Sequence, residues 1–161
     1  MEVKIHGLKE LKRELNQLEP RMQKNILRGA VFSVARQVRD ETKANAPVSD
    51  RGKTGRYAHA PGTLRRAIIA RRGRGDKHTI NSYVSILTGG PTNGKIVDGK
   101  LSFKDRPDAY YWRFIEWGFT DRGGTHHPGT HFVARAYESM RNKVMGIMAS
   151  YVRTRLDKLE K

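Results

Sequence analysis

The feature that most constrains this fold is an apolar repeat between residues 21 and 46. Apolar side chains recur there at every fourth position and cations occupy the outer face; the repeat comprises Met22, Ile26, Ala30, Val34 and Val38. This spacing predicts one long α-helix with a single buried side. Ala46-Pro47 ends the helix, because the residue before a proline avoids the helical conformation. A chain of 161 residues built around such a helix suits a single domain, 1–161.

Two further helices are predicted by the same periodicity. A short amphipathic helix covers 7–18, where leucines recur at spacings of three and four. A closing helix runs from His131 to about Lys158, with Thr130 as its N-cap. Its apolar stripe comprises Val133, Ala136, Tyr137, Met140, Val144, Ile147, Met148, Tyr151 and Val152.

Short strands and turns fill the middle of the chain. A turn of helix at 62–66 feeds a strand at 67–71, and a second strand covers 80–86. A Gly-rich insertion at about 88–108 carries hairpin arms at 96–97 and 101–103. Residues 48–61 are predicted to form a mobile basic loop and 123–129 a second loop. The fold class is therefore α+β, a small antiparallel sheet packed against two long helices.

Positive charge dominates the composition and is concentrated in one segment. The chain has 32 Lys and Arg against 16 Asp and Glu, a net charge of +16. Residues 51–77 hold nine cations and only Asp76, so half of that charge lies there. Such a segment attracts polyanions, although a solvated surface is the alternative. The residues proposed to face a partner or DNA are Arg51, Lys53, Arg56, Arg65, Arg66, Arg71, Arg72 and Arg74.

The sequence gives no support to an enzyme. Without cysteine, disulfides and thiolate chemistry are excluded. His126, His127 and His131 are close in sequence, but a metal site needs three or four converging ligands, so a loop that caps a helix or contacts a partner is preferred. Glu116 and Asp121 are the candidates for an acid–base pair, with nothing to fix their separation. No nucleophile motif or phosphate loop is present, and we predict no catalytic, cofactor-binding or metal-binding residues.

An aromatic run, Tyr110 to Phe119, stands out in this polar chain. As a strand or a short helix it would place Tyr111, Phe114 and Ile115 in the core. Either structure leaves some of the other aromatic side chains pointing away from the core. Exposed Trp, Tyr and Arg are enriched in protein interfaces, so the run is also a candidate contact surface.

Several motifs occur in an order that resembles a known family. They are Gly7-Leu8-Lys9-Glu10-Leu11, Ala46-Pro47, Thr54-Gly55, Gly62-Thr63-Leu64-Arg65-Arg66-Ala67-Ile68, the run Tyr111-x-x-Phe114-Ile115-Glu116-Trp117-Gly118, and Pro128 to Phe132. Together they resemble the tail-completion, or neck, proteins of long-tailed phages, the gene-ten-like family of lambdoid siphophages. The chain departs from that pattern at Phe119, where the family usually has Thr, and at 130–133.

The resemblance implies a non-enzymatic structural protein of the virion, made in the cytoplasm of the bacterial host. It implies a homo-oligomeric ring, a hexamer, at the head-proximal end of the tail, in contact with tail tube or tail terminator and head-connector proteins. The turn at Glu116-Trp117-Gly118 would shape the contact surface, with Gly118 supplying a close approach or a positive φ. The predicted interface comprises Tyr110, Trp112, Glu116, Trp117, Gly118, Phe119 and Phe132.

The partner of the basic segment is left open between an adjacent ring and packaged DNA. The alternative function is a nucleic-acid-binding protein that uses the Arg-rich residues 51–77. No apolar run is long enough to span a membrane, and no membrane partner is expected.

Overall fold

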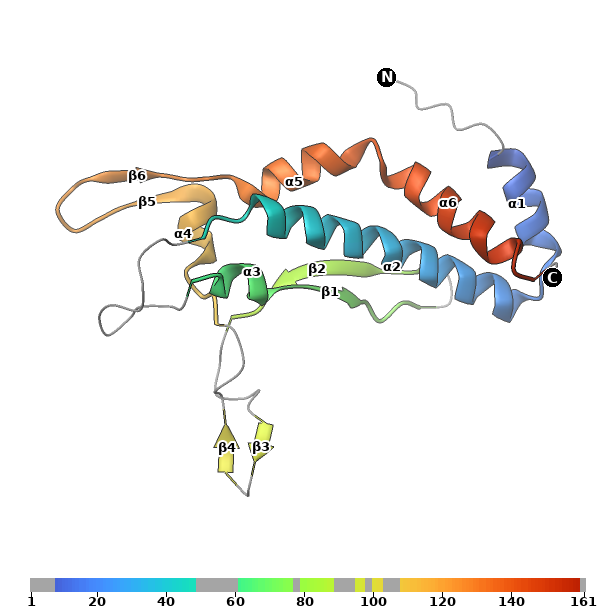
Figure 1. Ribbon diagram of the computed structural model, residues 1–161, viewed down its shortest axis with the longest axis horizontal. Coiled ribbons are helices and arrows are strands. Elements are labelled where there is room, and N and C mark those ends of the chain that lie inside the picture. The colour runs from blue at the N-terminus through green and yellow to red at the C-terminus, as the bar shows by residue number, and fades with distance from the viewer. Residues whose placement is uncertain are drawn as a thin grey trace. The chain divides into compact units, whose positions relative to one another are not determined.

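The computed structural model describes residues 8–48, 61–76, 79–88, 95–97, 100–102 and 108–159. They contain helices and short antiparallel strands, which confirms the α+β class (Figure 1). The helices are α1 Leu8–Gln17, α2 Pro20–Asn45, α3 Thr63–Ala67, α4 Trp112–Trp117, α5 Phe132–Arg141 and α6 Val144–Leu156. The strands are β1 Ile68–Arg72, β2 Ser82–Ile86, β3 Lys95–Val97, β4 Lys100–Ser102, β5 Gly118–Thr120 and β6 His126–Pro128. Most of the basic loop predicted at 48–61, residues 49–60, lies outside the described residues.

The described strands form three separate pairs instead of one small sheet. β1 pairs with β2, and backbone bonds from Leu87 to Ala67 and from Gly73 to Asn81 show that they run antiparallel. β3 and β4 are the hairpin arms predicted in the insertion, and they pair antiparallel. β5 and β6 form a hairpin that includes residues predicted to be a loop. The loop prediction at 126–128 is therefore wrong, because those residues pair with the strand that follows α4.

The described chain forms two compact units, to which α2, β1, β2 and α5 each contribute residues. The first unit comprises Met1–Arg39, Ala70–Val84 and Tyr137–Lys161, and the second comprises Asp40–Ile69 and Ser85–Ala136. The assignment to a single domain stays a prediction.

The core of the first unit lies where α1, α2 and α6 meet. The apolar repeats predicted in the first two helices supply it: Leu11 and Leu15 from α1, and Ile26 and Ala30 from α2, are buried. α6 adds Ala149, Val152 and Leu156. Figure 1 shows α1 beside the N-terminal end of α2 and the C-terminal end of α6, and α1 contacts α6. Full burial of each Leu stabilises the unit by about 1.5–3 kcal/mol.

Gly29 lets α6 approach α2 closely. It lies buried in the interior of α2, where glycine is normally unfavourable by about 1 kcal/mol relative to alanine. A Cβ at this position would overlap the ring of Tyr151, lying 2.6 Å from Cζ and 2.7 Å from Cε1. The phenol of Tyr151 therefore occupies the space that a side chain at position 29 would fill.

The predicted closing helix is broken into α5 and α6. Asn142 and Lys143 separate them, and the Lys143 amide donates to Met140 O at 2.9 Å in a tight turn. The buried residues explain the break, since Met140 and Ala149 are both buried although an unbroken helix, at about 100° per residue, would place them on opposite sides. Tyr137, predicted in the apolar stripe, is 60% exposed.

The second unit has its core around α3, the start of β1 and the start of α5. Four alanines and three larger side chains fill it: Ala46, Leu64, Ala67, Ile68, Ala109, Phe132 and Ala136 are buried. Arg65 Nε donates to Ala46 O at 3.0 Å, and Arg135 donates to Asn45 O at 3.5 Å. These cations satisfy carbonyls at the C-terminus of α2, where positive charge also favours the helix dipole.

Candidate assembly surface

The aromatic run folds as a short helix, α4, followed directly by strand β5 (Figure 1). The turn before α4 is fixed by two bonds, from the Tyr110 amide to Asp108 Oδ1 at 3.1 Å and from the Trp112 amide to Ala109 O at 3.0 Å. A helix of 6 residues is too short to be stable alone, so tertiary contacts must hold it.

Glu116 provides the strongest of these contacts. Its side chain is only 4% exposed, and it accepts two backbone hydrogen bonds from the first turn of α5. Val133 N donates to Oε2 at 2.9 Å and Ala134 N donates to Oε1 at 3.1 Å. A carboxylate at this position satisfies amides that have no partner within the helix and also favours its N-terminal dipole. Glu116 therefore caps a helix that begins far from it in the sequence.

The C-terminal carbonyls of α4 are satisfied in return by the residues that precede α5. Thr130 N donates to Ile115 O at 2.8 Å, and the Thr130 hydroxyl donates to the same oxygen at 3.0 Å. The amide of His131, which has φ 49°, donates to Glu116 O at 3.1 Å. Thr130 was predicted as the N-cap of the closing helix, and this is wrong because its hydroxyl is bound to α4 while Glu116 takes the helix amides.

Gly118 makes the junction between α4 and β5 possible. It has φ 83°, and a Cβ would lie 2.5 Å from His127 O and 2.7 Å from Gly129 N. Both reasons considered from the sequence, a positive φ and a close approach, hold at this residue. Gly129 in turn packs against the backbone of Glu116 and Trp117. The two glycines allow the end of α4 and the end of β6 to touch backbone to backbone.

Asp121 organises the tip of the β5–β6 hairpin. Its carboxylate accepts from His127 Nε2 at 3.1 Å and from the amides of Gly123 at 2.9 Å and Thr125 at 3.0 Å. The hydrogen bond with His127, followed by that from the Thr125 amide, lowers the pKa of Asp121 below its ordinary value. His126 lies 3.5 Å from the Thr120 hydroxyl. Across the described ranges, no three His, Asp or Glu side chains converge to hold a metal.

Four large aromatic side chains remain exposed above this framework, and we call them the aromatic surface: Tyr110, Phe114, Trp117 and Phe119. Trp117 is 61% exposed and Phe114 is 52% exposed, so the prediction that Phe114 lies in the core is wrong. Phe114 and Trp117 are three residues apart in α4 and therefore lie on one side of it, whereas Tyr110 precedes the helix and Phe119 follows it. Phe119 contacts the Phe114 ring at 5.8 Å and stacks on His127 at 4.7 Å.

Neighbouring side chains hold the aromatic surface in place. Trp112 packs on Trp117 with ring centroids 5.6 Å apart, and Arg113 lies over the Trp112 ring at 5.6 Å. Tyr111 contacts the edge of Tyr110 at 5.7 Å. Partial burial, and then the nearby Asp108 carboxylate, raise the pKa of Tyr111. Exposed rings with few rotatable bonds lose little entropy when a partner covers them.

The predicted interface residues differ in exposure. Tyr110, Trp117 and Phe119 are exposed, Trp112 and Gly118 are half-buried, and Glu116 and Phe132 are buried. The capping role of Glu116 was not predicted from the sequence. The available signal was a single carboxylate within an aromatic run, upstream of a predicted helix start.

The described members of the basic segment also divide. Arg65 is used to cap α2, and Arg66 donates to the Thr63 hydroxyl at 3.2 Å; both belong to the second unit. Arg71, Arg72 and Arg74 are exposed residues of the first unit. The other three, Arg51, Lys53 and Arg56, lie outside the described residues.

A comparison with models of protein families shows to which family the chain belongs. A model of the HK97-gp10-like family, described as "Bacteriophage HK97-gp10, putative tail-component", matches residues 9–118. The chain belongs to this family. The resemblance read from the sequence is confirmed over α1 to Gly118, whereas the motif from Pro128 to Phe132 lies beyond the match. Searches among curated proteins and among solved structures found no match.

The HK97-gp10-like match includes α4 and ends where the β5–β6 hairpin begins. The buried framework of the aromatic surface thus comes partly from the matched region, through Glu116, and partly from the segment after it, through α5. Within the described residues, no helix combines the length and the apolar character that crossing a membrane requires.

Proposed function

We propose that this phage tail component is a non-enzymatic structural protein of the virion. It forms a hexameric ring at the head-proximal end of the tail, completes the tail and joins it to the filled head. The observation that supports the proposal most strongly is the aromatic surface of a chain that belongs to a phage tail family. Its neighbours in the particle are the tail tube or tail terminator and the head connector.

The aromatic surface has the properties of a subunit contact. Contiguous exposed apolar side chains on a soluble protein usually mark an interaction site. Trp, Tyr and Arg are enriched at the centre of such sites, and α4 together with the two tyrosines before it presents all three. Because a ring uses heterologous contacts, the surface of one subunit meets a different face of the next. Glu116 and Gly118 keep the surface in one conformation before assembly, which reduces the entropy cost of binding.

The role in head-to-tail joining is tested in the phage or prophage that encodes the chain. We expect deletion of the gene to leave filled heads and separate tails that do not join. A gold-labelled antibody should mark the head-proximal end of the tail in complete particles. Normal joined particles without the protein, or a label at the distal end of the tail, would contradict the proposal.

Exposed Arg71 and Arg74 favour a second candidate, a nucleic-acid-binding protein. That candidate requires duplex binding whose affinity falls steeply with salt and weakens in Arg71→Gln and Arg74→Gln for every sequence tested. Arg65 is unsuitable for this test because its loss also uncaps α2. If particles join normally with both arginines replaced and the duplex affinity does not change, the nucleic-acid-binding candidate is excluded and the structural role remains.

A further inference from the structure

The first unit contains a hollow of about 650 Å³ that the aromatic surface does not include. Side chains from α2, the end of β1, α6 and the residues after α6 line it. Its volume lies within the range of ordinary ligand pockets, so it can accept several side chains of a bound peptide.

Four cations surround this hollow: Arg28, Arg72, Arg155 and Lys158. None of the described residues that line it is acidic. The Asp76 carboxylate accepts the Thr79 amide at 2.6 Å and does not line the hollow. A smaller adjoining recess of about 130 Å³ shares Arg28 and Arg72 and adds the polar side chains of Asn81 and Ser82. The hollow therefore favours an anionic ligand.

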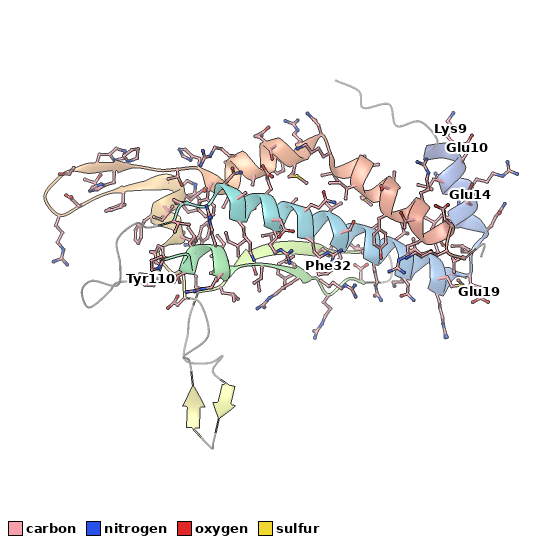
Figure 2. The ribbon with its side chains drawn as sticks, viewed as in Figure 1. Lys9, Glu10, Glu14, Glu19, Phe32 and Tyr110 are labelled. Carbon is pink, nitrogen blue, oxygen red and sulfur yellow. The ribbon has the colours of Figure 1, made fainter. Side chains whose placement is uncertain are left out.

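Two of these guanidinium groups are held in position by aromatic rings. Arg72 lies over the ring of Phe32, which Figure 2 labels on α2, at 4.8 Å from its centroid. Arg155 lies 5.5 Å from the Tyr151 ring centroid and its Nε donates to the Tyr151 hydroxyl at 3.3 Å. Guanidinium groups fixed in this way lose less freedom on binding a carboxylate than mobile lysines do.

Apolar side chains also line the hollow. Met22 and Leu159 are exposed there, at 38% and 48%, and Ile26 and Tyr151 lie beside them. A phosphate backbone has no group that gains from covering these side chains, whereas a peptide can place an apolar side chain on them and carboxylates on the surrounding cations.

We propose that this hollow binds an acidic peptide segment of a partner protein, anchored by a large apolar side chain. The segment places carboxylates against the four cations and its apolar side chain against Met22 and Leu159. This binding goes beyond the proposed ring and does not depend on it, because none of the residues that line the hollow belongs to the aromatic surface.

The test uses the full chain and three fluorescent probes: a short peptide of mixed glutamate and leucine, a peptide of glutamate alone with the same charge, and a short DNA duplex. The variant is Arg28→Gln with Lys158→Gln. Its matched control is Lys9→Gln with Arg13→Gln, which removes the same charge from exposed positions of α1. Met22→Ser tests the apolar contact separately.

We expect the mixed peptide to bind most tightly and to lose affinity by about tenfold or more in the hollow variant, with a change of less than about twofold in the control. Met22→Ser should weaken the mixed peptide and leave the glutamate peptide unchanged. Equal binding of both peptides, equal losses in the two charge variants, or absence of peptide binding would overturn the proposal. Duplex binding that alone depends on Arg28 and Lys158 would assign the hollow to nucleic acid instead.

Discussion

At the scale of single residues, Glu116 is the side chain on which the aromatic surface depends. It lies between half-buried Ile115 and exposed Trp117, yet its carboxylate is buried and bonded to two amides of α5. A buried carboxylate without such partners would be strongly unfavourable, so the residue and the start of α5 require one another.

Replacement by glutamine tests this dependence. Glu116→Gln keeps one acceptor oxygen but turns an amide group toward a helix amide that needs an acceptor, so we expect a loss of about 1–3 kcal/mol in the free energy of unfolding. The control is Glu138→Gln on α5, where an exposed carboxylate lies 3.9 Å from Arg141 and should contribute at most about 0.5 kcal/mol. Equal effects of the two variants in urea unfolding would refute the capping role.

At the scale of elements, the β5–β6 hairpin depends on the ionisation of Asp121. Since its pKa is lowered in the folded chain, chiefly by His127, the stabilisation is complete above the ordinary pKa of about 4 and is lost as the pH falls through the lower folded value. We expect the amides of Gly123 and Thr125 to lose hydrogen-exchange protection over that acidic window.

The Asp157 amide serves as the internal control. It donates to Arg153 O at the C-terminus of α6 and should keep its protection. Asp121→Asn should abolish the acid dependence at the hairpin tip. A tip that loses protection at the same pH with asparagine present would show that another group controls it.

The pairing of α2 with α6 gives a second prediction at this scale. Gly29→Ala would ordinarily strengthen a helix interior by about 1 kcal/mol, but here its methyl group overlaps the Tyr151 ring, and overpacking costs about 1–3 kcal/mol. We therefore expect Gly29→Ala to destabilise the chain with Tyr151 present and to be neutral or stabilising in Tyr151→Ala. A double-mutant cycle of unfolding free energies measures the difference, and the same cost in both backgrounds would exclude the close contact.

At the scale of the whole molecule, the sequence predicted elements better than contacts. The periodicity at 21–46 located α2, because apolar residues at every fourth position share one face in a helix and not in a strand. The periodicity of the closing helix could not locate the break before α6. The apolar residues on both sides of the break fit a single stripe, and only their contacts with distant residues separate them. The capping role of the Glu116 carboxylate could not be predicted for a similar reason: its amide partners lie 17 and 18 residues away.

The exposure of the aromatic run could be predicted only in part. Alternation or helical spacing shows that some rings must point outward, and Tyr110, Trp117 and Phe119 do so. Phe114 was assigned to the core because its neighbours allow either face, and only the packing of Glu116 against α5 decides which side of α4 is buried.

Ring formation through the aromatic surface is tested by the mass of the purified chain in solution, measured by light scattering over a concentration series. We expect a discrete closed oligomer of the 18.4 kDa chain, a hexamer, that dissociates in Trp117→Ala combined with Phe119→Ala. The control Tyr137→Ala removes an equally exposed ring outside the aromatic surface and should leave the oligomer intact. A monomer at every concentration, or an oligomer that survives loss of Trp117 and Phe119, would refute a ring built on the aromatic surface.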